Sequence, residues 1–384
     1  SSDLPSYTNT VPKASDAGKP GNYVIVAFAH QPASMDSYQH KPRTDSDNQK
    51  NEEKNALNGG DAPMFSDCKA PDLRVSIRQT GTVYATDGTA YGPIHQTLWA
   101  NQTVDDVKDA FQTYVYKDPS TGYEMPYNIY LPEGYDKNKK KVYPLVVFIA
   151  DASANIEDAK AVLYQGNGAT VWATPEEQAK HPAIILAPQY TEKLIRSIGM
   201  MTTDTHKWTK GLSLVTHLIL DVTNRYRVDK TRIYGTGQSQ GGMANIAISD
   251  AYPDLFAAQY LVACQWDVQE MKALKDKKLW IVVCQGDTKA FPAMNEATAL
   301  WEQEGTAVAR SKMWDSQEGE SVFNQMTRVM NEQEAPIRYT VFKDGNHMYT
   351  WSFAYNIEGI RDWMFSQSQS TSVLNHPASQ YKKQ

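Results

Sequence analysis

Short runs of consecutive apolar residues recur along the second two thirds of the chain. Such runs are typical of strands that are buried on both faces of a parallel sheet. They occupy residues 143–149, 183–187, 257–264, 278–284 and 337–342. Between them, residues 212–225 carry apolar side chains at helical spacing, and residues 351–366 are predicted to form a closing helix. Alternating buried strands and helices predict an α/β fold with a doubly wound, parallel sheet.

Two further strands flank a turn just before the first buried run. Residues 111–116 and 123–131 read as strands, and the segment Asp118-Pro-Ser-Thr-Gly122 between them has strong turn chemistry. This pattern predicts a hairpin that forms the antiparallel edge of the main sheet.

The first quarter of the chain has a different pattern. Residues 22–30 and 82–86 read as strands, residues 72–80 alternate apolar and polar side chains as a half-buried strand does, and residues 94–100 suit another strand. Residues 36–61 carry almost no aliphatic side chains, so we expect a long surface loop there. These strands predict a small N-terminal β domain.

The predicted boundaries divide the chain into four parts. They are a leader over residues 1–21, an N-terminal β domain over residues 22–110, a catalytic domain over residues 111–367 and a polar tail over residues 368–384.

Composition excludes several classes of protein. The chain has 384 residues, enough for two domains, and its net charge of −6 argues against a nucleic-acid binder. Three cysteines are too few for a disulfide framework, and no apolar run reaches the roughly 20 residues of a membrane span. The chain starts with Ser and shows no signal peptide, so we expect a mature or trimmed protein that is secreted or displayed at the cell surface. Its oligomeric state stays open.

One motif carries candidate chemistry. Residues 237–241 read Gly-Gln-Ser-Gln-Gly, a G-x-S-x-G sequence between a predicted strand at 232–235 and a predicted helix at 243–250. Such a turn exposes the serine hydroxyl at the edge of a sheet, so Ser239 is the candidate nucleophile. The competing interpretation is an ordinary glycine-rich turn between a strand and a helix.

A serine hydroxyl needs a base to activate it, and the base needs an acid to orient it. Asp287 follows the apolar run 278–284, and His347 follows the run 337–342, so all three groups are expected at the carboxyl ends of strands. The order Ser, Asp, His is that of α/β hydrolases. Asp267 and Asp344 are rival acids, but Asp344 is too close to His347 in the chain to orient it easily.

Other residues are candidates for binding the substrate. The backbone N–H of Gln240 and one from the loop 150–153, assigned to Ala152, are the expected oxyanion donors. Trp208, Trp266 and Met348 are expected at the same sheet edge, where an aromatic acyl group would stack, although each is equally well explained as loop packing. The chain has no H-E-x-x-H and no clustered Cys/His spacing, so we predict neither a metal nor a cofactor.

The chain from about residue 111 to 367 resembles α/β-hydrolase esterases of the polyhydroxybutyrate-depolymerase and feruloyl-esterase type, in the branch with an N-terminal immunoglobulin-like domain. The matching stretches are residues 126–135, 172–182, 184–189, 237–242, 252–257, 285–292 and 346–351. The resemblance implies a serine carboxylesterase with Ser239, Asp287 and His347 as its triad, and it favours an immunoglobulin-like sandwich for the β domain. Relatives usually open the oxyanion loop with His and then a small residue, whereas this chain has Ala150 there.

The expected function is therefore hydrolysis of small acyl or aryl esters, such as acetyl or feruloyl esters on plant polysaccharide. The alternatives are a polyester hydrolase, a peptidase of the prolyl-oligopeptidase type and an inactive binding protein with a hydrolase fold. The peptidase is disfavoured because no blade-length repeat precedes the motif. The segment 189–215 has no long apolar lid, and its Thr202, Asp204 and His206 suit an open, wet cleft.

Overall fold

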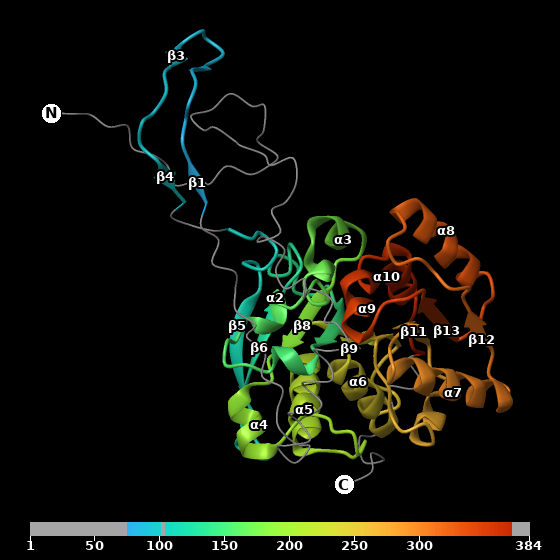
Figure 1. Cartoon of the computed structure of the whole chain (residues 1–384). Coiled ribbons are helices and arrows are strands. Elements are labelled where there is room, and N and C mark those ends of the chain that lie inside the picture. Colours follow the sequence, from blue (N-terminus) through green and yellow to red (C-terminus); the bar gives the residue numbers. More distant parts are fainter. Residues whose placement is uncertain (1–74, 101–103, 371–384) are drawn as a thin grey trace, which may run out of the picture. The chain divides into compact units, whose positions relative to one another are not determined.

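The computed structural model describes residues 75–100 and 104–370 (Figure 1). The chain divides into two compact units, of which the described parts are residues 75–100 with Val104 and residues 105–370. The strand predicted at residues 22–30, the polar loop at 36–61 and the leader lie outside the described residues, as does most of the predicted tail.

The described part of the first unit contains two short antiparallel ladders. β1 (Ser76–Ile77) pairs with β4 (Leu98–Trp99), and β2 (Val83–Tyr84) pairs with β3 (Ala90–Tyr91). Three of these strands fall within predicted ones but are shorter, whereas β3 was not predicted. A hairpin turn at Asp87 joins β2 to β3, and its carboxylate accepts a hydrogen bond from Thr89 N at 2.9 Å.

A nine-stranded sheet forms the centre of the second unit. Its strands, from edge to edge, are β12 (Val308–Arg310), β13 (Ile337–Phe342), β11 (Leu279–Cys284), β10 (Ala258–Val262), β9 (Val228–Gln238), β7 (Tyr143–Ile149), β8 (Ile184–Pro188), β6 (Glu124–Tyr130) and β5 (Gln112–Lys117). The strands from β12 to β8 are parallel, and the hairpin β5–β6 joins them antiparallel through β8. The predicted parallel sheet and its antiparallel edge are both confirmed, but β12 was not predicted.

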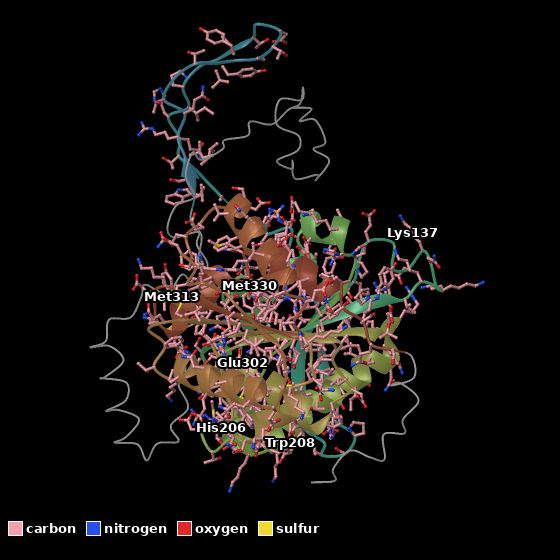
Figure 2. The ribbon with its side chains drawn as sticks, turned by 90° about the vertical axis from the view of Figure 1, so that its right-hand side faces the viewer. Lys137, His206, Trp208, Glu302, Met313 and Met330 are labelled. Carbon is pink, nitrogen blue, oxygen red and sulfur yellow. The ribbon has the colours of Figure 1, made fainter. Side chains whose placement is uncertain are left out.

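Helices cover both faces of this sheet (Figure 2). Buried side chains from one face pack against α4 (Glu192–Ile198), α5 (Lys210–Arg225), α6 (Gln240–Ala251) and α7 (Ala290–Gln303). The opposite face packs against α2 (Ala161–Tyr164), α8 (Glu320–Asn331), α9 (His347–Ala354) and α10 (Glu358–Phe365). The short helix α3 (Pro175–Lys180) is joined to α10 by side-chain contacts. These two apolar layers hold the sheet rigidly, which is what fixes its carboxyl edge.

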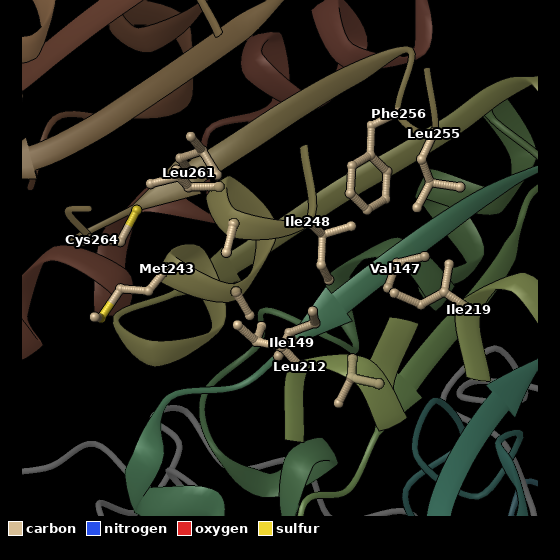
Figure 3. Close-up of a cluster of buried hydrophobic side chains, with 14 of the residues drawn as sticks. Val147, Ile149, Leu212, Ile219, Met243, Ile248, Leu255, Phe256, Leu261 and Cys264 are labelled. Atoms are coloured by element: carbon tan, nitrogen blue, oxygen red, sulfur yellow. The ribbon is translucent and has the colours of Figure 1, made fainter. Parts of the chain in front are cut away.

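Helix α5 shows how sequence sets the ends of an element. The Thr209 hydroxyl accepts a hydrogen bond from Leu212 N at 3.0 Å, which caps the first turn. Leu212 and Ile219 lie on the face that packs against Val147 of β7 and its neighbours, in the layer shown in Figure 3. Burying an aliphatic side chain of this kind contributes about 1.5–3 kcal/mol.

The prediction of one closing helix over residues 351–366 is wrong, because the chain forms two helices there. α9 ends at Ala354 and α10 begins at Glu358. Arg361 donates from Nη1 to the Tyr355 carbonyl at 2.6 Å, which satisfies a carbonyl at the end of α9. The Tyr355 ring is buried against Phe148 and Tyr260, and this anchoring explains the break. Helix α8, which precedes β13, was not predicted either.

Within the described residues, none of the helices is both long and apolar enough to cross a membrane.

Candidate active site

Ser239 lies in a sharp turn between β9 and α6. It is the N-cap residue of α6, and its backbone has φ 49° and ψ −120°, a region that side-chain-bearing residues rarely adopt. A Cβ atom at Gly241 would lie 1.8 Å from the Ile149 carbonyl oxygen, and one at Gly237 would lie 2.6 Å from the same oxygen. Only glycine fits both places, so the two flanking glycines allow α6 to cross tightly over the end of β7.

His347 joins the two other candidate groups by hydrogen bonds. Its Nε2 lies 2.8 Å from Ser239 Oγ, and its Nδ1 lies 2.6 Å from Asp287 Oδ2. His347 is the first residue of α9, where the Asn346 side chain accepts a hydrogen bond from Tyr349 N at 3.0 Å and fixes the start of the helix. The structure therefore brings together all three residues that were predicted as the triad.

Asp287 is buried, and both of its carboxylate oxygens have partners. Oδ1 accepts hydrogen bonds from Lys289 N at 3.0 Å and from Ala290 N at 2.9 Å, and Oδ2 faces His347. Burial acts to raise the pKa of Asp287, but the hydrogen bond and charge of His347 together with the two backbone N–H groups outweigh it, so the pKa is lowered. The carboxylate is thus ionised and its orientation is fixed, as an acid that orients a histidine requires.

The loops that carry Asp287 and His347 touch through two glycines. A Cβ atom at Gly286 would lie 2.2 Å from the carbonyl oxygen of Gly345. Gly345 has φ 75°, which favours glycine. This backbone contact holds the acid and the base at hydrogen-bonding distance, and reading the sequence did not identify it.

The two rival acids lie elsewhere. Asp267 is exposed and accepts hydrogen bonds from Gln269 N at 2.9 Å and Glu270 N at 3.1 Å, the role of a turn cap. Asp344 is exposed, with φ 57°. Asp287 is the one of the three candidates whose carboxylate contacts His347.

The oxyanion candidates lie on two adjacent segments. Gln240 is the first residue of α6, and the first N–H groups of a helix have no partner within the helix. Ala152 begins a 3₁₀ turn just after β7, where Asp151 Oδ1 accepts a hydrogen bond from Ser153 N at 2.7 Å. Backbone donors from these two places suit an oxyanion at Ser239, and the assignment of Gln240 and Ala152 stays a prediction.

Two buried side-chain pairs tie these segments together. Gln238 donates from Nε2 to Asp151 Oδ2 at 2.8 Å, and Asn155 donates from Nδ2 to Gln240 Oε1 at 2.8 Å. All four residues are at most 4% exposed. They fix the loop after β7 relative to the turn at Ser239, and sequence reasoning missed Asp151, Asn155 and Gln238 in this role.

The three predicted substrate-binding side chains pack against different neighbours, and their role stays a prediction. The ring of Trp208 lies 6.1 Å from that of Tyr252, the C-cap residue of α6. Figure 2 shows Trp208 and His206 on the side of the sheet that α5 to α7 cover. Trp266 is buried, with its ring 5.0 Å from that of His206. Met348 packs against the core on the other face.

A small cavity lies beside the loop after β7. It measures about 10 Å³ and is lined by Ile149, Ala150, Asn155, Gln189, Tyr190 and Met201, among others. This space is about what a single water molecule needs.

One group of side chains in the described part of the chain is suited to a metal ion. It consists of Glu177, His181 and Asp362, and it is separate from the triad.

Two comparisons show similarity between this chain and known esterases. Residues 4–92 match the family described as the esterase Ig-like N-terminal domain. A crystal structure of a thermostable esterase is similar to the chain, with 25% identity, a TM-score of 0.61 and coverage of 80% of this chain and 76% of that one. The chain has the α/β-hydrolase fold. The resemblance to esterases with an N-terminal Ig-like domain, predicted from the sequence, is confirmed.

Other solved structures are less similar to the chain. A ferulic acid esterase is 14% identical, with a TM-score of 0.41 over 64% of this chain and 93% of that one. The S954A mutant of a feruloyl esterase module from Clostridium thermocellum, complexed with sinapinate, is 11% identical, with a TM-score of 0.44 over 66% and 89% of the two chains. No curated protein matches the sequence of this α/β hydrolase.

Proposed function

We propose that this α/β hydrolase is a serine carboxylesterase that acts on esters with small acyl groups. The observation that carries the proposal is the pair of hydrogen bonds from His347 to Ser239 and Asp287, at 2.8 and 2.6 Å. The similar thermostable esterase and the match to an esterase N-terminal domain favour ester bonds as the substrate.

In the proposed mechanism, His347 Nε2 takes the proton of Ser239 Oγ as that oxygen attacks the ester carbonyl. Asp287 stabilises the imidazolium that forms and holds its ring in place. The N–H groups of Gln240 and Ala152 bind the oxyanion of the tetrahedral intermediate. His347 then gives its proton to the leaving alcohol, and a water molecule hydrolyses the acyl-enzyme by the same steps.

The size of the acyl group is inferred from the segment between Gln189 and Val215. This segment has no long apolar lid, and an alkyl chain gains about 0.8 kcal/mol per CH₂ only where it can be buried. Trp266 is buried, so its ring has little surface to offer an aromatic acyl group. An acetyl ester therefore suits the site better than a feruloyl or palmitoyl ester.

Several finer points of the sequence interpretation stay proposals. They are the boundaries at residues 22, 111 and 367, a polysaccharide-linked substrate, and an extracellular location, which the Ig-like domain of esterases favours.

The test is a substrate panel with p-nitrophenyl acetate, p-nitrophenyl palmitate, methyl ferulate and a peptide anilide. We expect kcat/KM to be highest for the acetate and the anilide to be left intact. Ser239→Ala should lower kcat by about 10⁴- to 10⁶-fold without loss of fold. Ser197→Ala, at an exposed serine of α4, is the matched control and should keep full activity.

Cleavage of the anilide in preference to the esters would instead identify a peptidase. A kcat/KM that is higher for the palmitate or the ferulate than for the acetate would overturn the assignment of small acyl groups. It would leave the assignment as an esterase intact. Undiminished hydrolysis by Ser239→Ala would refute the triad, and no hydrolysis of any substrate by the wild type would favour an inactive binding protein.

A further inference from the structure

Three side chains outside the candidate active site converge between α3 and α10. One ligand atom each from Glu177, His181 and Asp362 lies within 4.8 Å of the other two. His181 Nε2 is 2.8 Å from Asp362 Oδ1. Glu177 lies in α3, His181 is the C-cap residue of that helix, and Asp362 lies in α10, so the group joins two helices (Figure 1).

Glu177 is the feature that ordinary packing does not explain. It is 2% exposed, and its Oε2 accepts a hydrogen bond from Arg361 Nε at 2.7 Å. Its other oxygen, Oε1, is buried and has no hydrogen-bond partner among the residues that the structure describes. Leaving a carboxylate oxygen buried without a partner is costly, so this atom is available to a cation.

Neighbouring residues hold the side chains of Glu177 and His181 in place, as the residues around a metal ligand do. Arg361 holds Glu177 by one oxygen and is itself fixed through its hydrogen bond to the Tyr355 carbonyl. The ring of His181 stacks on Phe365, with centroids 4.4 Å apart and an interplanar angle of 11°. The nearby ammonium of Lys180 is paired with Glu358. Lys180 and Arg361 are therefore engaged by carboxylate oxygens other than Glu177 Oε1 and Asp362.

We propose that Glu177 Oε1, His181 Nε2 and Asp362 Oδ1 bind a zinc ion that cross-links α3 to α10. One imidazole nitrogen and two carboxylate oxygens are a donor set that zinc accepts, at about 2.0–2.2 Å from each atom. Atoms within 4.8 Å of one another reach those distances by shifts of about 1 Å, since ligands at a tetrahedral angle are about 3.4 Å apart. The hydrogen bond between His181 and Asp362 gives way to two bonds to the metal.

A groove gives the ion access to its ligands. The zinc site is also remote from Ser239. Asp362 lines an open groove of about 660 Å³ between α8 and α10, which also contains Asn331 and Arg328. His181 precedes the amino end of β8, whereas Ser239 follows the carboxyl end of β9, and both strands run parallel to β7. The two sites therefore lie at opposite edges of the sheet, and the zinc stabilises the fold without taking part in hydrolysis.

The experiment measures zinc binding by the full-length protein after treatment with a chelator. Titration with ZnCl₂ should give one high-affinity zinc ion per wild-type chain that the variants below lack. At a hundredfold excess over Kd, the zinc should raise Tm by roughly 5 °C. MgCl₂ at the same concentration should have no effect, because magnesium disfavours imidazole.

Asp362→Asn is the main variant, because its exposed side chain is not needed for packing. It should lose the zinc-dependent rise in Tm while keeping ester hydrolysis, and His181→Gln should behave in the same way. The matched control is His217→Gln, since His217 also faces a carboxylate, with Nδ1 3.0 Å from Asp118 Oδ2, but has no third ligand in the group. Wild-type protein that binds no zinc, or Asp362→Asn and His181→Gln that bind it as tightly as wild type, would overturn the proposal.

Discussion

Replacing Gly286 with alanine tests whether one backbone contact sets the geometry of the triad. The new Cβ would lie 2.2 Å from the Gly345 carbonyl oxygen, whereas real Cβ atoms essentially never approach closer than 3.0 Å. The difference is 0.8 Å, and it falls on two backbones, neither of which has a flexible side chain that can move aside. The loops that carry Asp287 and His347 must therefore separate.

The expected loss follows from the present distance. If the whole shift appears between His347 Nδ1 and Asp287 Oδ2, their separation grows from 2.6 Å to about 3.4 Å, beyond the 2.6–3.2 Å of a working hydrogen bond. Misplacement by about 1 Å costs on the order of 10²-fold in rate, and complete loss of the acid costs about 10⁴-fold. We therefore expect kcat to fall by about 10²- to 10⁴-fold, with a loss of stability of about 1–3 kcal/mol from the overpacking.

The assay is kcat for p-nitrophenyl acetate, together with Tm and circular dichroism. Gly319→Ala is the control, because a Cβ at Gly319 meets no atom within 4 Å. It should keep its activity. A Gly286→Ala protein with wild-type kcat and Tm would show that the loops are not held by this contact, and the reasoning would fail.

Two further predictions concern Asp287. Asp287→Asn should lower kcat by about 10⁴-fold, whereas Asp267→Asn should have little effect, and a reversal of this rank in the same ester assay would assign the acid to the loop after β10. Because the folded-state pKa of Asp287 is lowered, its contribution to stability is fully present above about pH 3.9 and is lost as the pH falls through the lowered value. Denaturant unfolding should therefore show the wild type losing stability faster than Asp287→Asn on acidification, and parallel curves would contradict the lowered pKa.

The sequence predicted the parallel sheet, its antiparallel edge and the three residues that the structure joins by hydrogen bonds, because each depends on local patterns. Buried parallel strands are continuous apolar runs, and the positions of Asp287 and His347 follow from where such runs end. The edge strand β12 has three residues, only one of them buried, so no run of apolar residues marks it. The break between α9 and α10 depends on Arg361, which comes six residues after the carbonyl that it binds and also pairs with a distant helix.

Contacts between distant segments could not be predicted from the sequence either, because they do not depend on local patterns. The pairs Asp151–Gln238 and Asn155–Gln240 join residues more than 80 positions apart, and nothing in either segment alone predicts its partner. Trp208 and Trp266 were expected near the nucleophile because their loops follow nearby strands. A loop's place in the order of the chain does not give the direction of its side chains, so the contacts of the two rings with His206 and Tyr252 could not be predicted.

The backbone of Ser239 has a consequence for how this fold changes over time. A φ of 49° at a residue with a side chain costs about 1–3 kcal/mol, and glycine at the same position would be free of that cost. Catalysis is the reason to keep serine there, because glycine has no hydroxyl to offer. A lineage released from selection for hydrolysis would thus gain stability by a single substitution at its former nucleophile, so that loss of activity and greater heat resistance would arise together.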